Sequence, residues 1–227
     1  MCGRFKRSVT WAEYYAYLTL TGAVPNAPPR YNIAPTDPVY AVRRAPAGAP
    51  ELVTLRWGLI PAWAKDAKGG AMMINARADT IAEKPAYREA FVHRRCLVLA
   101  DGFYEWKLEG KIKQPYLITR RDGGPFAFAG LWERWQRRGP GGGEPIESCT
   151  IVTTDANARL RPIHDRMPVI LARADHDAWL GAADPAAAKM LLQPYPDADL
   201  AVTRVSTWVN SVKNDDAACA EPERRLL

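Results

Sequence analysis

The sequence has few of the residues that bind metal ions. Its 227 residues include only three histidines and four cysteines, at Cys2, Cys96, Cys149 and Cys219. No two cysteines have the short spacing that is typical of a zinc site. We therefore expect no metal centre, and nothing in the sequence calls for another cofactor. Cys96 and Cys149 occur in apolar runs, which predicts buried, unreactive strand cysteines.

Long apolar segments are also absent. No stretch approaches the roughly 18 apolar residues of a membrane-spanning helix. The first residues do not contain the apolar core of a secretory signal peptide. We expect a protein that makes no contact with a membrane and works in the cytoplasm, where thiols stay reduced.

Positive charge and aromatic residues are in surplus. The formal net charge is +6 and the sequence pI is about 9.2. Eight tryptophans and nine tyrosines exceed the needs of a core of this size. A basic protein with spare aromatic residues suits a nucleic-acid partner, but charge alone is equally compatible with a solvated positive surface.

Apolar periodicity predicts strands and short helices in mixed order. Strands are expected over residues 39–44, 51–57, 96–106 with a break at Asp101-Gly102, 115–119, 126–131, 148–154, 167–171 and 201–206. Thr10 and Glu13 form a capping-box pattern that opens a helix through about residue 20, and further helices are expected over 83–92, 175–180 and 184–192. Residues 22–38, rich in proline, glycine and asparagine, read as an irregular loop.

The elements do not follow a regular β-α-β alternation. This favours a single α+β domain around a curved, barrel-like, mainly antiparallel β-sheet with flanking short helices. The domain is expected to span residues 2–213. The polar, alanine-rich residues 214–227 are expected to form a flexible C-terminal tail.

The second residue offers unusual chemistry. If Met1 is removed, Cys2 carries a free α-amine and a thiol two carbons apart. The amine can capture an aldehyde as a Schiff base, and the thiol can then close a thiazolidine ring. Alternatively, the thiol can act as an N-terminal nucleophile with the amine as its base.

Five other residues could complete a site around Cys2. Glu105 lies between Tyr104 and Trp106, where burial would raise its pKa toward neutrality; an outward-facing glutamate on an alternating strand is the alternative. His164 precedes a buried strand and could be catalytic or could simply bond Asp165. The remaining candidates are polar or cationic: Asn75 and Arg77, which share one face of an extended segment, and Arg4, close to Cys2.

Six short motifs, in order, resemble one family. They are Met1-Cys2-Gly3-Arg4-Phe5, Tyr31-Asn32-Ile33-Ala34-Pro35, Arg56-Trp57-Gly58-Leu59-Ile60-Pro61, Asn75-Ala76-Arg77, Gly102-Phe103-Tyr104-Glu105-Trp106 and His164-Asp165-Arg166-Met167-Pro168. They resemble the SOS response-associated peptidase (SRAP) family, the abasic-site processing proteins, from Cys2 to about Val209.

The resemblance implies a protein that binds single-stranded DNA and traps abasic sites through a thiazolidine link to the N-terminal cysteine. The implied catalytic residues are Cys2, Asn75, Glu105, His164 and Thr153. The implied DNA-binding residues are Arg4, Arg77, Trp106, Arg166, Asn32 and, as a wedge against bases, Trp63. Reversal of the link, a lyase side reaction, peptidase-like self-processing limited to exposing Cys2, and a monomeric state are further expectations.

Two other functions remain open on the residues alone. An N-terminal-nucleophile hydrolase, such as a glutamine amidotransferase domain, also begins with a processed Met-Cys-Gly, and its thiol would attack an amide. That function leaves the tryptophan-rich and arginine-rich motifs unexplained. In a non-catalytic nucleic-acid-binding module, Cys2 would be incidental, and its replacement would leave DNA binding intact.

Overall fold

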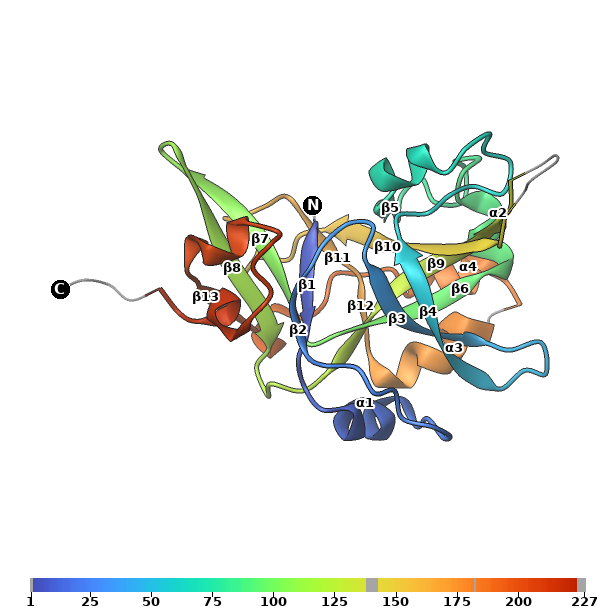
Figure 1. Ribbon diagram of the computed structural model, residues 1–227, viewed down its shortest axis with the longest axis horizontal. Helices are drawn as coiled ribbons and strands as arrows, with labels where there is room; N and C mark the ends of the chain where they lie inside the picture. The colour runs from blue at the N-terminus through green and yellow to red at the C-terminus, as the bar shows by residue number, and fades with distance from the viewer. Residues whose placement is uncertain (1, 138–142, 182, 224–227) are drawn as a thin grey trace.

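Five strands close into a small barrel (Figure 1). The computed structural model describes residues 2–137, 143–181 and 183–223. The barrel strands are β3 (Pro38–Arg44), β4 (Pro50–Trp57), β6 (Arg95–Ala100), β9 (Phe126–Trp135) and β10 (Ile146–Asp155). They pair in the order β10-β4-β3-β6-β9, and β9 pairs back onto β10. Within the ring, only the β10–β4 pairing is parallel.

The alternation along each strand separates the barrel interior from its exterior. Cys96 and Val98 belong to one buried cluster, whereas Leu97 and Leu99 belong to a second. The second cluster is covered by the short helices α1 (Trp11–Leu18), α2 (Arg88–His93), α3 (His176–Gly181) and α4 (Pro185–Met190). The interior is narrow, because a Cβ at Gly130 would lie 2.9 Å from the Cys96 sulfur.

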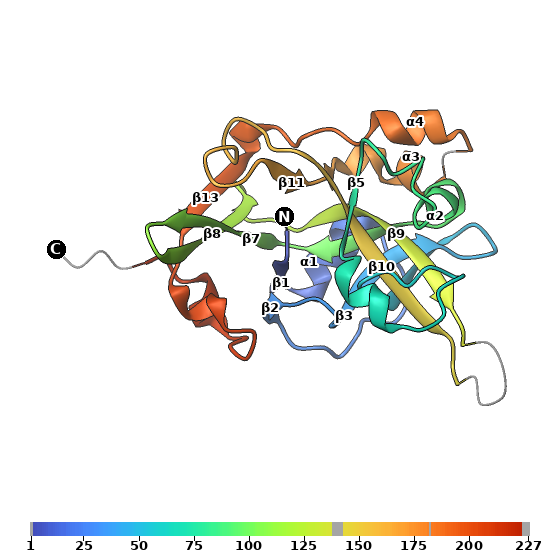
Figure 2. The same cartoon turned by 90° about the horizontal axis from the view of Figure 1, so that it is seen from above.

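A second, antiparallel sheet lies against one end of the barrel. Its order is β13 (Leu200–Arg204), β8 (Ile112–Arg120), β7 (Gly102–Glu109), β1 (Arg4–Arg7) and β2 (Arg30–Ile33). Figure 2 shows β1 between the β7–β8 pair and the barrel strands β9 and β10. The N-terminal strand is therefore an internal strand, bonded on both edges.

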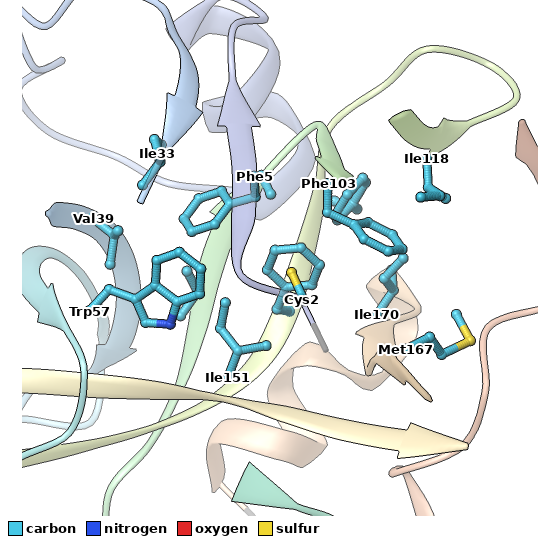
Figure 3. Packing of buried hydrophobic residues seen from close by; sticks show 14 of the residues in the cluster. Cys2, Phe5, Ile33, Val39, Trp57, Phe103, Ile118, Ile151, Met167 and Ile170 are labelled. Atoms are coloured by element: carbon cyan, nitrogen blue, oxygen red, sulfur yellow. The ribbon is translucent and has the colours of Figure 1, made fainter. Parts of the chain in front are cut away.

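Phe5 anchors β1 to the barrel. Its ring packs edge-on against Trp57 at a centroid distance of 5.1 Å and against Phe128 at 5.7 Å. Figure 3 shows the sulfur of Cys2 in the same cluster, close to Ile151. The first residues of the chain thus form part of the core.

Three short strands and the helix ends complete the fold. β5 (Asn75–Arg77) and β11 (Arg166–Pro168) pair with β10, and β12 (Ile170–Leu171) pairs with β9. The predicted capping box of α1 is confirmed, and the helix ends at Leu18 because Thr19 adopts a left-handed conformation. None of the helices in the described residues is long and apolar enough to span a membrane.

Two expectations about the connecting segments were wrong. The expected loop 22–38 contains β2, which pairs with β1. The expected flexible tail is packed on the domain as far as residue 223; residues 224–227 lie outside the described part. The Asp215 carboxylate accepts the backbone N–H groups of Tyr31 and Asn32 at 2.6 and 2.7 Å and pairs with Arg30, while Cys219 is fully buried.

Replacing Asp215 should therefore destabilise the whole domain. Asp215→Ala leaves two backbone N–H groups of β2 without an acceptor, which costs about 1–3 kcal/mol. Urea denaturation would measure the free energy of unfolding. Lys213→Ala, an exposed neighbour, is the matched control and should stay within about 0.5 kcal/mol of wild type. Equal stabilities for the two variants would contradict the packed position of this segment.

Candidate active site

A pocket of about 930 Å³ lies between β1, the edge of β7 and the C-terminal segment. Past Tyr104, β7 extends beyond its pairing with β1, so the pocket reaches both faces of the strand. Glu105 enters it from the face that carries Phe103, and Trp106 enters from the opposite face. Arg4 and His164 also line the pocket, which brings four of the predicted residues together.

Cys2 directly precedes Gly3 and Arg4, which line the pocket, but does not itself line it. Its side chain is fully buried, and Asn75 donates its side-chain amide to the Cys2 carbonyl at 2.9 Å. Burial raises the pKa of the Cys2 thiol well above its ordinary value, so the sulfur is protonated at neutral pH. The buried Oδ1 of Asn75 has no hydrogen-bond partner among the residues that the structure describes.

Glu105 is buried rather than turned to solvent. Its side chain is 2% exposed. Burial raises the pKa of its carboxyl from 4.5 to about 7, because the anion loses its hydration. A group that is about half protonated at neutral pH can both donate and accept a proton.

His164 is held by the start of β11. The backbone N–H of Arg166 donates to His164 Nδ1 at 3.0 Å, and the carboxylate of Asp165 lies 2.8 Å from the same atom. One nitrogen cannot accept the amide proton and donate to the carboxylate at once. Burial lowers the pKa of His164, so the neutral ring with Nδ1 as acceptor and the proton on Nε2 is favoured. The Asp165 side chain, 85% exposed, can move away.

The Arg4 guanidinium is fixed in the pocket wall. It donates to Asn32 Oδ1 at 2.9 Å and to the Val209 carbonyl at 3.1 Å, and lies 5.8 Å from the centre of the Trp106 ring. Asn32 is 1% exposed, and its amide nitrogen donates to three carbonyls of the C-terminal segment. Asn32 therefore positions Arg4, and its expected contact with DNA stays a prediction.

The fold and this pocket can now be compared with known proteins. The family model for "SOS response associated peptidase (SRAP)" matches residues 1–212. The chain belongs to the SRAP family.

Named relatives and solved structures agree. The chain is 42% identical over 231 residues to the abasic site processing protein YoaM of Bacillus subtilis, with 100% of both chains covered. It is 34% identical to the abasic site processing protein HMCES of Gallus gallus, over 86% of this chain and 66% of the other. A crystal structure of a protein from Bacteroides thetaiotaomicron superposes with a TM-score of 0.86 at 27% identity, covering 98% of this chain and 100% of that one.

Two residues that the SRAP resemblance implies, Arg166 and Thr153, are hydrogen-bonded to each other outside the pocket wall. Arg166 is 6% exposed and donates to the carbonyl and hydroxyl of Thr153 at 2.7 and 2.8 Å. Thr153 is fully buried. Neither residue lines the pocket, and the same is true of Cys2 and Asn75. Arg166 fixes the start of β11, and with it His164. The expected catalytic role of Thr153 and the expected DNA contact of Arg166 stay predictions.

The other expected DNA contacts lie outside the pocket. Arg77 is exposed and forms an ion pair with Asp79, whose pKa falls to about 2 through this hydrogen bond. Trp63 is 64% exposed on the loop after β4 and is not among the residues that line the pocket.

The sequence did not single out several lining residues. Thr36, in the loop after β2, has a φ of 77°, a strained value for a residue with a side chain, and lies in the pocket wall. Lys113 and Leu108 come from the β7–β8 hairpin, and Asn210 comes from the C-terminal segment. Of these residues, only Thr36 could have been found from the sequence, because it directly follows the Tyr31–Pro35 motif.

The raised pKa of Glu105 predicts how stability varies with pH. The folded state binds the proton more tightly than the unfolded state, so the contribution of Glu105 to stability is full below about pH 4.5 and is lost as pH rises through about 7. The separation between 4.5 and 7, at about 1.36 kcal/mol per pH unit, amounts to about 3 kcal/mol.

Urea denaturation of wild type and Glu105→Gln at several pH values would measure this effect. Wild type should lose stability relative to Glu105→Gln between about pH 5 and about pH 8, because only wild type acquires a buried charge. Glu89→Gln, at an exposed position on α2, should follow wild type at every pH. Parallel curves for wild type and Glu105→Gln would contradict the raised pKa.

Proposed function

We propose that this protein captures abasic sites in single-stranded DNA as a covalent adduct of Cys2, after removal of Met1. The names of its relatives, abasic site processing proteins, support the substrate. The observation that carries the chemistry is the position of Cys2: Asn75 holds its backbone beside Glu105, whose pKa is about 7.

The first step forms an imine between the Cys2 α-amine and the ring-opened sugar. An α-amine has a pKa of roughly 7.7–8.0, so a useful fraction is neutral at pH 7. Neutral His164, with its proton on Nε2, assists opening of the sugar hemiacetal. The amine then attacks the aldehyde carbon, and Glu105 protonates the departing hydroxyl, which leaves as water.

The second step closes the thiazolidine ring. The Cys2 sulfur attacks the imine carbon, its proton moves to the nitrogen through Glu105, and no atom is lost. Because both groups belong to one residue, the attack is intramolecular, an advantage worth up to roughly 7–11 kcal/mol. The buried Oδ1 of Asn75 supplies an acceptor for the N–H that forms.

Because the thiol is buried, imine formation precedes ring closure. A protonated sulfur inside the core reacts poorly with electrophiles in solution. It becomes effective only after the imine has placed the sugar carbon beside it. The same proton transfers run backward would release the sugar, and the acidified carbon next to the imine permits elimination of the 3′ phosphate as a lyase side reaction.

DNA would be held by charge and stacking without base reading. Arg4 and Trp106 are in the pocket, and Arg77 would exchange Asp79 for a phosphate. Affinity should therefore fall with salt and show little sequence preference. Every residue named comes from one chain, so the proposed reaction needs only a monomer. The proposed place of action is the cytoplasm. Peptidase-like activity is needed only to expose Cys2.

Replacing the cysteine should separate the two steps. On single-stranded DNA with one abasic site, wild type should give a heat-stable band on a denaturing gel. Cys2→Ala keeps the amine but lacks the thiol, so it should give a band only when sodium borohydride reduces the imine. Intact mass must first show that Met1 is absent from both proteins.

Cys219→Ala is the matched control, because Cys219 is also fully buried but has no α-amine beside its thiol. It should react like wild type. A heat-stable band from Cys2→Ala without borohydride, or no band from wild type lacking Met1, would reject the mechanism. Release of ammonia from glutamine would then favour an N-terminal-nucleophile hydrolase.

A further inference from the structure

The β7–β8 hairpin extends beyond the body of the protein (Figure 1). Its two strands are in strict register, with Trp106 opposite Pro115 and Leu108 opposite Lys113. Residues directly opposite in an antiparallel pair share one face, as do residues two apart along a strand. Trp106, Leu108 and Lys113 therefore form a single face, which we call the platform.

The platform faces the pocket. All three of its residues line the pocket, and Leu108 is 68% exposed. The opposite face carries Lys107 and Ile112, and neither lines the pocket although Ile112 is 58% exposed. The hairpin thus presents one leucine and one lysine to the pocket and a similar pair away from it.

Asn210 fixes the platform in place. Trp106 Nε1 donates to Asn210 Oδ1 at 2.7 Å, and Asn210 Nδ2 donates to the Lys113 carbonyl at 3.1 Å. The oxygen and the nitrogen of the Asn210 side chain thus join the C-terminal segment to β7 and to β8. A platform held in this way loses little conformational entropy when a ligand binds.

We propose that the platform binds a base-bearing nucleotide that flanks the abasic site in the same strand. The base packs on Leu108 and the accessible part of Trp106, and the Lys113 ammonium pairs with a phosphate. Leu108 follows Glu105 by three residues, about 10 Å along an extended strand, so the contact lies beyond the reacting sugar. This proposal rests on the function proposed above.

The chemistry of the hairpin favours a nucleotide as the occupant. Lys113 is exposed on the platform and Lys111 is exposed in the turn beside it, whereas Glu109, the one acidic residue of the hairpin tip, lies on the opposite face and is paired with Arg204. A cationic strip next to an aromatic and an aliphatic side chain is the combination that binds single-stranded nucleic acid without reading sequence. The platform is also continuous with the pocket that would hold the abasic sugar.

Fluorescence anisotropy with a labelled single strand that contains a tetrahydrofuran abasic analogue tests this surface. The analogue cannot form an imine, so binding is measured without capture. Leu108→Ser should weaken binding roughly fivefold or more, because the base loses its apolar contact with the leucine side chain. Lys113→Gln should lower the slope of log affinity against log salt by about 0.7, the value for one phosphate contact.

Ile112→Ser and Lys107→Gln are the matched controls, since they make the same changes on the opposite face. Both should bind like wild type. Strands with flanking nucleotides only 5′ or only 3′ to the analogue give a second test. The Leu108→Ser penalty should persist on one of these strands and disappear on the other.

Platform variants that behave like their controls on every strand would overturn the proposal. So would a Leu108→Ser penalty that is equal on the 5′-only and 3′-only strands. If wild type binds the analogue but forms no adduct with a true abasic site, the capture mechanism fails while the platform result still stands. Lys113→Gln changes only an exposed side chain, so at least one variant tests the surface without risk to folding.

Discussion

Packing of Phe5 into the mouth of the barrel fixes the N-terminal strand. Burying such a ring contributes about 1.5–3 kcal/mol, and β1 is also bonded to β2 and β7. Cys2 lies three residues before Phe5 in the same cluster, so the reactive residue has the position of a core residue. A chain end that is ordinarily mobile is thereby held in one position by packing and strand pairing.

Strand β7 carries residues for both the proposed proton transfer and the proposed DNA contact, because its side chains alternate between two faces. Glu105 lies on the face toward Cys2 and is dehydrated there, which places its pKa near neutrality. Trp106 and Leu108 lie on the other face, toward the C-terminal segment. Because β7 continues past its pairing with β1, one pocket reaches both faces, and the proposed proton transfer and the proposed DNA contact would lie side by side.

The local pattern of the sequence predicted most of the framework. Apolar runs predicted the barrel strands and the capping box predicted α1, whereas the position of Glu105 between two aromatic residues left both burial and exposure open. The missed features depend on contacts distant in sequence. β2 is completed by Asp215, 184 residues after Tyr31, and the burial of Asn32, Thr153 and Arg166 follows from packing that no local pattern encodes. Motifs identified these three residues but did not predict that they would be buried.

The pH dependence of covalent capture tests most directly whether Glu105 drives the chemistry. Single-turnover rates would be measured on saturating single-stranded abasic DNA from about pH 5.5 to about pH 8.5, for wild type and Glu105→Gln. The account predicts an inflection near pH 7 for wild type, and a slower rate without that inflection for Glu105→Gln. Equal rates with the same pH profile would show that proton transfer depends on another group and would contradict the account.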